Sequence, residues 1–220
     1  MHLPRQAGRV RSPDVVMKLW LLVPVKPFQQ GKSRLTEVLA ANERVALNQA
    51  MLARVLARAQ AANVLAGILV VSRDRAALAQ AEAAGVIIVR EQGHDLNGAL
   101  SQAAQVASAQ GAEAVLVLPA DLPLLTADDI RQLYLLGQAQ KGIVITRSPD
   151  GGTNALLMRP PGAIEFAFGP ASFARHTQLA QSVGVPVQTY ASPTLALDVD
   201  WPEDLVRLRA AAGGLDVGAL

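Results

Sequence analysis

Short runs of Val, Leu and Ile alternate with longer segments of helical periodicity along most of this chain. Runs that are apolar at nearly every position are typical of strands buried on both faces, as in parallel sheets covered by helices. Strands are therefore expected at 19–25, 67–72, 86–89, 114–118, 142–146, 155–158 and 185–190. Helices are expected at 42–62, 74–84, 97–110, 126–139, 172–183 and 202–211.

This alternation predicts an α/β fold with one mostly parallel open sheet and helices on both of its faces. A length of 220 residues suits a single domain with a large core. In open sheets of this kind ligands bind beyond the carboxyl ends of the strands. Functional residues are therefore expected in the loops that follow the strands.

Composition and charge argue against several classes of protein. The chain has no cysteine, which favours a cytoplasmic protein without disulfides. No apolar run approaches the roughly 20 residues of a membrane-spanning helix, so no membrane association is expected. Residues 1–16 hold three arginines and one aspartate, which account for the whole formal charge of +2. The balanced remainder lacks the cationic face of a nucleic-acid-binding protein, so no nucleic-acid partner is expected.

The first 16 residues form a segment unlike the rest of the chain. They contain Pro4, Gly8 and Pro13 and show no periodicity, so a disordered N-terminal extension is expected. Met17 followed by Lys18 resembles a natural start, and one folded domain is expected over residues 17–220.

The loop after the first expected strand carries two of the four lysines of the chain, Lys26 and Lys32. A strand that leads through a cationic loop into a helix offers backbone N–H groups, a helix dipole and ammonium groups to a phosphate. Gly31, Lys32 and Ser33 look like the end of a P-loop, but that motif requires glycine at the position of Lys26. A phosphate site of another kind and an ordinary basic loop are the interpretations left open.

Three aspartates follow other expected strands. Asp121 comes just after the buried run 114–118. Asp198 and Asp200 are two residues apart, so on extended backbone their carboxylates face the same way. Like charges side by side are unfavourable unless a cation lies between them. Alternatively, Asp121 is a turn residue and Asp200 only caps the helix that begins near Pro202.

Lysines and aspartates at neighbouring strand ends suit the transfer of a nucleotidyl group. Mg²⁺, a hard cation, takes oxygen ligands from one or two carboxylates and from substrate phosphates. The metal and the lysines neutralise the charge that develops during in-line displacement at phosphorus. The three histidines lack the paired spacing of a zinc site.

Two glycine-bearing turns suit the binding of an anion. Gly151 and Gly152 precede Thr153 and can form a tight turn with free N–H groups. Residues 168–172 lead into an expected helix whose N-terminus can accept an anion, with Ser172 as the capping residue. A turn or a cap without a ligand is the alternative for each.

Five motifs lie in one order along the chain after Met17. They are PVKP at 24–27 with GKSRL at 31–35, PADLPLL at 119–125, GGTNALL at 151–157, FGPASFARH at 168–176 and LDVDWPEDL at 197–205. Together they resemble the motifs of the 2-phospho-L-lactate and phosphoenolpyruvate guanylyltransferases of coenzyme F(420) biosynthesis. The resemblance implies a single-domain, GT-A-like nucleotidyltransferase fold, GTP as donor, Mg²⁺ as cofactor and a small phosphorylated three-carbon acid as acceptor.

The resemblance also implies roles for particular residues. GTP would be bound by Pro24, Lys26, Lys32, Ser33, Arg34 and Asn97. The metal would be held by Asp121, Asp198 and Asp200, and the catalytic residues would be Lys26, Lys32 and Asp121. The acceptor would be bound by Thr153, Gly169 and Ser172.

The chain departs from the family pattern on the acceptor side. The loop before Thr153 is shorter and poorer in glycine than is usual, and Ala171 stands where the family usually has glycine. The acceptor therefore stays open between phosphoenolpyruvate, which we prefer, 2-phospho-L-lactate and 3-phospho-D-glycerate.

Two further functions and the oligomeric state stay open. A molybdenum-cofactor or sugar-phosphate nucleotidyltransferase would share the fold, but residues 23–25 lack the glycine-rich loop that usually precedes the lysine. A non-catalytic nucleotide sensor would tolerate loss of the metal ligands, whereas all three aspartates are present. The sequence does not distinguish a homodimer from other oligomeric states.

Overall fold

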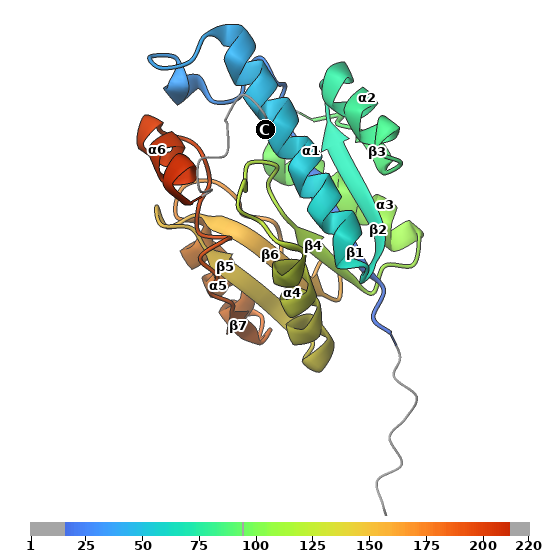
Figure 1. The fold of residues 1–220 in the computed structure, drawn as a ribbon. Helices are drawn as coiled ribbons and strands as arrows, with labels where there is room; N and C mark the ends of the chain where they lie inside the picture. The colour runs from blue at the N-terminus through green and yellow to red at the C-terminus, as the bar shows by residue number, and fades with distance from the viewer. Residues whose placement is uncertain (1–15, 94, 212–220) are drawn as a thin grey trace, which may run out of the picture.

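The computed structural model, which describes residues 16–93 and 95–211, is organised around a seven-stranded sheet with the order β3-β2-β1-β4-β6-β5-β7 (Figure 1). The strands are β1 Leu19–Pro24, β2 Leu65–Ser72, β3 Ile87–Arg90, β4 Ala114–Val117, β5 Gly142–Arg147, β6 Thr153–Arg159 and β7 Val187–Thr189. Neighbouring strands are parallel except where β6 runs antiparallel to β4 and β5. The predicted single-domain, mostly parallel sheet is confirmed.

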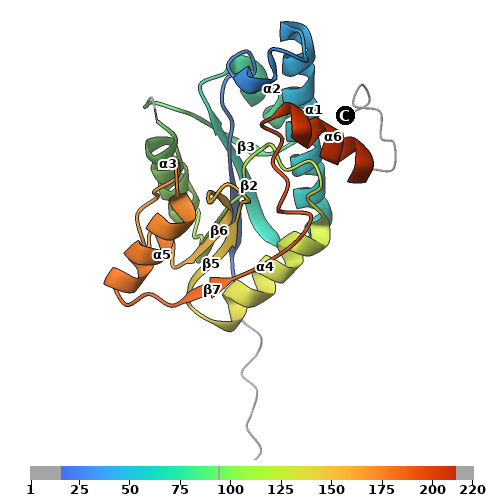
Figure 2. The same cartoon turned by 90° about the vertical axis from the view of Figure 1, so that its left-hand side faces the viewer.

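Helices cover both faces of the sheet, as predicted. They are α1 Ala41–Ala62, α2 Arg75–Ala83, α3 Leu96–Ala109, α4 Ala127–Ala139, α5 Ser172–Ser182 and α6 Pro202–Ala211, with a short 3-10 helix η1 at Ser33–Leu35. The helices α1, α2 and α4 pack on one face, and α3 and α5 pack on the other (Figure 2). None of the helices within the described residues is long and apolar enough to cross a membrane.

The central strand β1 shows why the strands read as continuous apolar runs. Leu19, Leu21 and Val23 point into the core beneath α1, α2 and α4, whereas Trp20 and Leu22 point into the core beneath α3. The Trp20 ring lies over Gly67 of β2, where a Cβ atom would come within 2.6 Å of it. A glycine is therefore required opposite this tryptophan.

The antiparallel direction of β6 positions Thr153 for a role at the carboxyl edge of the sheet. Only residues 148–152 separate β5 from β6, which is too short for the crossover that two parallel strands require. Thr146 pairs with Ala155 and Arg147 pairs with Thr153, so a β-bulge leaves Asn154 without a partner on β5. The sequence prediction placed the start of this strand two residues late and did not specify its direction.

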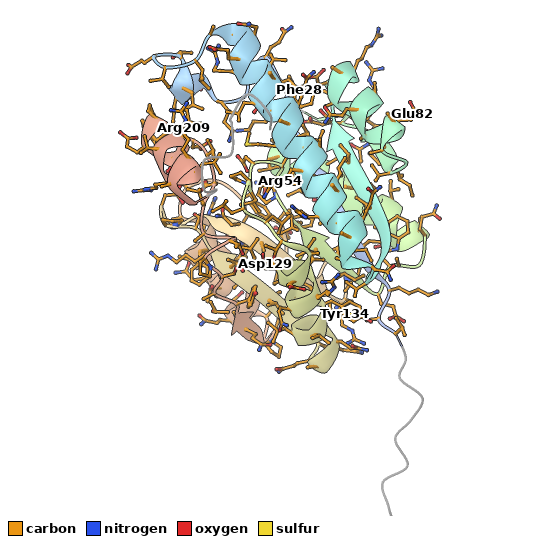
Figure 3. The ribbon with its side chains drawn as sticks, viewed as in Figure 1. Phe28, Arg54, Glu82, Asp129, Tyr134 and Arg209 are labelled. Atoms are coloured by element: carbon orange, nitrogen blue, oxygen red, sulfur yellow. The ribbon has the colours of Figure 1, made fainter. Side chains whose placement is uncertain are left out.

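The segment 190–201, here called the C-terminal strap, leads from β7 to α6 and is anchored on Asp129 at the N-terminal end of α4 (Figure 3). The hydroxyl groups of Ser192 and Thr194 donate to its carboxylate at 2.5 and 2.6 Å, and Tyr190 donates at 3.3 Å. Thr126 donates to it through both its hydroxyl and its N–H group. Asp129 is 3% exposed, so these hydrogen bonds replace its lost hydration.

Beyond the strap, α6 packs against the N-terminal half of α1. Leu205 and Leu208 of α6 join Leu47 and Met51 of α1 in a small apolar cluster that also contains Leu35 of η1. The predicted disordered extension covers residues 1–16, of which 1–15 lie outside the described residues.

We expect Asp129→Asn to lower the free energy of unfolding by about 2 kcal/mol, because the amide cannot accept all the donors that surround the carboxylate. Asp128→Asn is the matched control, since the Asp128 side chain is 83% exposed. Urea denaturation at pH 7 gives both values. Equal stabilities of the two variants would contradict an anchoring role for Asp129.

The difference in the free energy of unfolding between wild type and Asp129→Asn should depend on pH. Burial alone would raise the pKa of Asp129, but hydrogen bonds from the surrounding hydroxyl groups outweigh it and lower the pKa below its usual 3.8. A lowered pKa contributes stability that is present above the unfolded value and is lost as the pH falls through the folded value. The gap between wild type and Asp129→Asn should therefore narrow below about pH 4.

Candidate functional site

The carboxyl edge of β1 and β4 brings together three segments that are distant in the sequence. The loop after β1 carries Lys32, the loop after β4 carries Asp121, and the strap carries Asp200. The backbone N–H of Val199 donates to the carbonyl of Asp121 at 3.4 Å, which joins the strap to the second loop. The predicted convergence of the lysine loop and the aspartates is thus present.

Lys32 lies at the centre of this convergence. Its Nζ is 2.6 Å from Oδ2 of Asp121 and 3.0 Å from Oδ1 of Asp200. The Lys32 side chain is only 5% exposed. Its backbone is left-handed, with φ 58 and ψ 37, a conformation that costs a residue with a side chain about 1–2 kcal/mol. The contacts of Lys32 therefore have to outweigh this backbone strain.

The pKa values of both partners show that the ion pair stays charged. Burial opposes the charge of Lys32, but Asp121 and Asp200 outweigh it and raise the pKa of the lysine. Burial likewise opposes the ionisation of Asp121, and the charge and hydrogen bond of Lys32 lower its pKa nonetheless. The more distant charge of Lys26 acts on Asp121 in the same direction.

Asp198 forms none of the ion pairs within the described residues. Burial raises its pKa to about 6, and the negative charges of Asp121, Asp200 and Asp150 add to the effect. The site therefore holds more carboxylate than its buried lysine compensates. Such an excess of negative charge suits an additional cation.

The carboxylates of Asp121, Asp198 and Asp200 are ligands that suit a hard divalent cation, but they do not form a complete set of ligands around one point in this structure. The described residues contain no group of three or more acidic or histidine side chains close enough to hold one ion together. Mg²⁺ commonly takes only one or two protein carboxylates and completes its shell with phosphate oxygens and water. Two of the three predicted ligands, Asp121 and Asp200, are held by Lys32 in this structure.

The other residues of the lysine loop surround this ion pair. The guanidinium of Arg34 lies 3.4 Å from Oδ2 of Asp200 and 4.6 Å above the ring of Trp201. Lys26 and Ser33 are exposed, and Pro24 ends β1.

The side-chain carboxylate of Asp204, not that of Asp200, accepts the N–H groups of Asp200 and Trp201 at the start of α6. The alternative that Asp200 is only a helix cap is therefore wrong.

Asn97, predicted to bind GTP, uses its side-chain amide elsewhere. Its Nδ2 donates to the carbonyl of Phe168 at 3.2 Å, and its Oδ1 accepts the N–H of Phe168 at 2.8 Å. Both polar atoms of the amide thus hold the backbone just before Gly169. A contact between Asn97 and GTP stays a prediction.

The predicted acceptor residues Thr153 and Ser172 lie together. The hydroxyl of Ser172 donates to Oγ1 of Thr153 at 3.0 Å, and both side chains are buried. The prediction that Ser172 caps α5 is wrong, because Ala171 is the capping residue and Ser172 is the first residue of the helix. Gly169 has φ 123, a conformation that favours glycine.

The N-terminus of α5 offers fewer free donors than the sequence suggested. The N–H of Ser172 donates to the carbonyl of Gly169, and that of Phe173 donates to the carbonyl of Gly151. The second bond ties α5 to the turn at 148–152, which Asp150 closes by accepting the N–H of Gly152 at 2.9 Å. Asp150 also contributes to the raised pKa of Asp198, so this turn lies close enough for its charge to act on that aspartate.

The sequence prediction missed His176, which contacts the predicted acceptor residue Thr153. Its Nδ1 lies 3.2 Å from Oγ1 of Thr153, and its side chain is fully buried. The signal was the four-residue interval between Ser172 and His176, which places both on one face of a helix.

The chain was compared with families of known proteins. Residues 19–213 match the family model described as "Guanylyl transferase CofC like". The chain belongs to this family. The resemblance found from the five motifs is thereby confirmed.

Curated relatives agree with the family, and a solved structure shares the fold. Phosphoenolpyruvate guanylyltransferase of Rubrobacter xylanophilus is 44% identical over 90% of this chain and 96% of its own length. A 2-phospho-L-lactate guanylyltransferase of Methanothermobacter thermautotrophicus is 37% identical over 86% of this chain and 83% of its own. A putative nucleotide-diphospho-sugar transferase from Desulfovibrio desulfuricans shares the fold, with a TM-score of 0.74, 19% identity, and coverage of 91% of this chain and 90% of that one.

The departure of this chain from the usual family glycine at 171 has a measurable consequence. Ala171 has φ 54, so Ala171→Gly relieves about 1–2 kcal/mol of backbone strain and loses part of it to unfolded-state entropy. We expect a net gain of about 0.5–1 kcal/mol in the free energy of unfolding. Ala174→Gly, at an exposed position inside α5, should instead cost about 1 kcal/mol. Urea denaturation tests both, and losses of similar size would contradict the strain at Ala171.

Proposed function

We propose that this protein transfers GMP from GTP to phosphoenolpyruvate, releases pyrophosphate and forms enolpyruvyl-diphospho-guanosine for coenzyme F(420) biosynthesis. The observation that carries this proposal is the buried Lys32 held by Asp121 and Asp200 at the carboxyl edge of the sheet, beside the uncompensated Asp198. Membership of a guanylyltransferase family supports the same reaction. A non-catalytic sensor would not need this concentration of opposed charges.

The reaction requires little proton transfer. A phosphate oxygen of the acceptor attacks the α-phosphorus of GTP, and the bond from that phosphorus to the bridging oxygen of the pyrophosphate breaks. A phosphate monoester has a second pKa near roughly 6, so its oxygen is already mostly ionised at pH 7. No general base is needed, and the enclosed His176 is not placed to act as one. Catalysis then consists of positioning and charge neutralisation.

The residues of the lysine loop take the triphosphate. The exposed Lys26 binds phosphate oxygens directly. Lys32 exchanges its carboxylate partners for phosphate oxygens, which offer it comparable charge and hydrogen bonds. Asp121, Asp198 and Asp200 are the residues that would hold Mg²⁺, which would supply positive charge to neutralise the phosphates.

Phosphoenolpyruvate is the proposed acceptor because several relatives named as phosphoenolpyruvate guanylyltransferases are more similar to this chain than the relative named for 2-phospho-L-lactate. The proteins of that name from Rubrobacter xylanophilus and Roseiflexus castenholzii are 44% and 42% identical to this chain, against 37% for the 2-phospho-L-lactate guanylyltransferase. Thr153, Gly169 and Ser172 form the acceptor side. Cytoplasmic location and the lack of a nucleic-acid partner stay predictions, and the oligomeric state stays open.

The direct test incubates the purified protein with GTP, Mg²⁺ and one acceptor at a time, and follows pyrophosphate release. We expect release with phosphoenolpyruvate and less with 2-phospho-L-lactate or 3-phospho-D-glycerate. Release with a sugar phosphate instead, or with no acceptor at all, would contradict the proposal. Asp198→Asn should lower kcat at least about 100-fold because it removes a charge that holds the metal, whereas the exposed Asp128→Asn should not change it.

Because Lys32 supplies the positive charge between Asp121 and Asp200, its removal should make the protein respond to metal alone. Lys32→Met leaves Asp121 and Asp200 without their shared ammonium group. Addition of 10 mM MgCl₂, roughly ten times an expected millimolar Kd, should then raise Tm by about 3 °C. The exposed Lys26→Met is the control and should respond like wild type. Equal shifts in all three proteins would show that Lys32 does not occupy the place of a metal charge.

A further inference from the structure

A chain of hydrogen bonds runs from the segment before α5 through His176 to the acceptor side of the site. The N–H of Ala167 donates to Nε2 of His176 at 2.9 Å, and Nδ1 of His176 lies 3.2 Å from Oγ1 of Thr153. Ser172 donates to the same Oγ1 atom at 3.0 Å. The ring of Phe168 packs edge-on against His176 with centroids 4.9 Å apart, which restricts the imidazole orientation.

The first bond assigns the tautomer of His176. Because Nε2 accepts the N–H of Ala167, its lone pair is occupied and the ring hydrogen lies on Nδ1. Burial, with a contribution from Arg175, lowers the pKa of His176 to about 4, so the ring is neutral at pH 7. Nδ1–H therefore donates to Thr153, and its direction cannot reverse while the bond to Ala167 exists.

Counting hydrogens then leaves one hydroxyl donor free. Oγ1 of Thr153 accepts two hydrogens, one from His176 and one from Ser172. The hydrogen of the Thr153 hydroxyl has no acceptor among the hydrogen bonds of the described residues. If the Thr153–Ser172 bond were reversed, the Ser172 hydroxyl would be left over instead. In either arrangement the pair keeps one hydroxyl hydrogen for a further acceptor.

This free hydroxyl matters because neighbouring backbone donors are already used. The N–H groups of Ser172 and Phe173 donate to the carbonyls of Gly169 and Gly151. A buried hydroxyl hydrogen without a partner is unfavourable, and an anionic oxygen is the acceptor that stabilises it most. Phosphate and carboxylate oxygens share this chemistry.

We infer that His176 is a positioning residue for the acceptor. By its bond to Thr153, His176 directs the one free hydroxyl hydrogen of the Thr153–Ser172 pair towards an anionic oxygen of that substrate. This inference rests on the proposed function and extends it. It adds a hydroxyl donor to the acceptor side, and the buried His176 determines the direction of that donor. His176 acts through Thr153 and does not touch the substrate. The free hydrogen thereby favours ligands that place an anionic acceptor beside the pair, such as the phosphate or carboxylate of a three-carbon acid.

The test measures the KM of each substrate separately in His176→Phe and His176→Asn. Phenylalanine keeps a planar ring but removes the donor, so the KM for phosphoenolpyruvate should rise at least about tenfold, which corresponds to about 1.4 kcal/mol. The KM for GTP should stay within twofold. Asparagine places an N–H close to the position of Nδ1 and should restore the KM for phosphoenolpyruvate to within about threefold of wild type. Equal rises in both KM values, or no rescue by asparagine, would overturn the inference.

A double-mutant cycle keeps the inference testable if His176→Phe is too unstable to assay at 25 °C. Thr153→Val removes the hydroxyl with little change of shape. His176→Leu, like His176→Phe, removes the donor, and the pair Thr153→Val with His176→Leu should have the same KM for phosphoenolpyruvate as Thr153→Val alone. Additive effects would mean that His176 does not act through Thr153.

A binding measurement separates this inference from the proposed reaction. Inorganic phosphate and phosphoenolpyruvate should each raise Tm of wild type more than that of Thr153→Val, even without GTP. If wild type binds these anions but releases no pyrophosphate, the proposed function fails while the positioning role stands. If wild type is active and Thr153→Val responds to both anions as wild type does, the positioning role fails.

Discussion

The shared ion pair of Lys32 with Asp121 and Asp200 is the interaction on which the rest of the site is built. It connects the loop after β1 with the loop after β4 and with the C-terminal strap, over sequence separations of 89 and 168 residues. Removal of Lys32 would leave two carboxylates close together without their shared cation, a penalty that water at the partly exposed Asp121 and Asp200 reduces. The same lysine favours the ionised form of Asp121 and holds it close to Asp200.

The surrounding structure holds this arrangement from two sides. On one side Asp129 gathers the hydroxyl groups of the strap onto α4, so that the following residues 198–200 return to the sheet edge. On the other side α6 packs on α1 and η1, next to the Arg34–Trp201 contact. Thr153 lies beside the bulge at Asn154 and is supported from within by His176. Charge therefore organises the proposed nucleotide side of the site, and a neutral hydrogen-bond chain organises the proposed acceptor side.

Much of the fold could be predicted from the sequence because the strands are buried on both faces and read as apolar runs. The lysine loop and the aspartates were also predictable, since residue types that bind phosphate and metal follow strands that end at one edge. Other features depend on contacts between distant residues. Neither the bond from Lys32 to Asp121 nor the pairing of Asn97 with Phe168 leaves a local signal in the sequence. The five-residue interval between β5 and β6 could have predicted the direction of β6. The role of His176 could not be predicted, because it depends on the hydrogen-bond partner of each ring nitrogen.

We propose that Lys32 takes the place of the Mg²⁺ charge beside Asp121 and Asp200 until the nucleotide binds. Lys32 then exchanges these carboxylates for oxygens of the triphosphate. A crystal structure of the protein with GTP and Mg²⁺, without acceptor, tests this most directly. The account predicts that Nζ of Lys32 leaves Asp121 and Asp200 and lies within about 3.2 Å of a triphosphate oxygen. A bound GTP whose phosphates lie elsewhere, with Lys32 still paired to both aspartates, would contradict it.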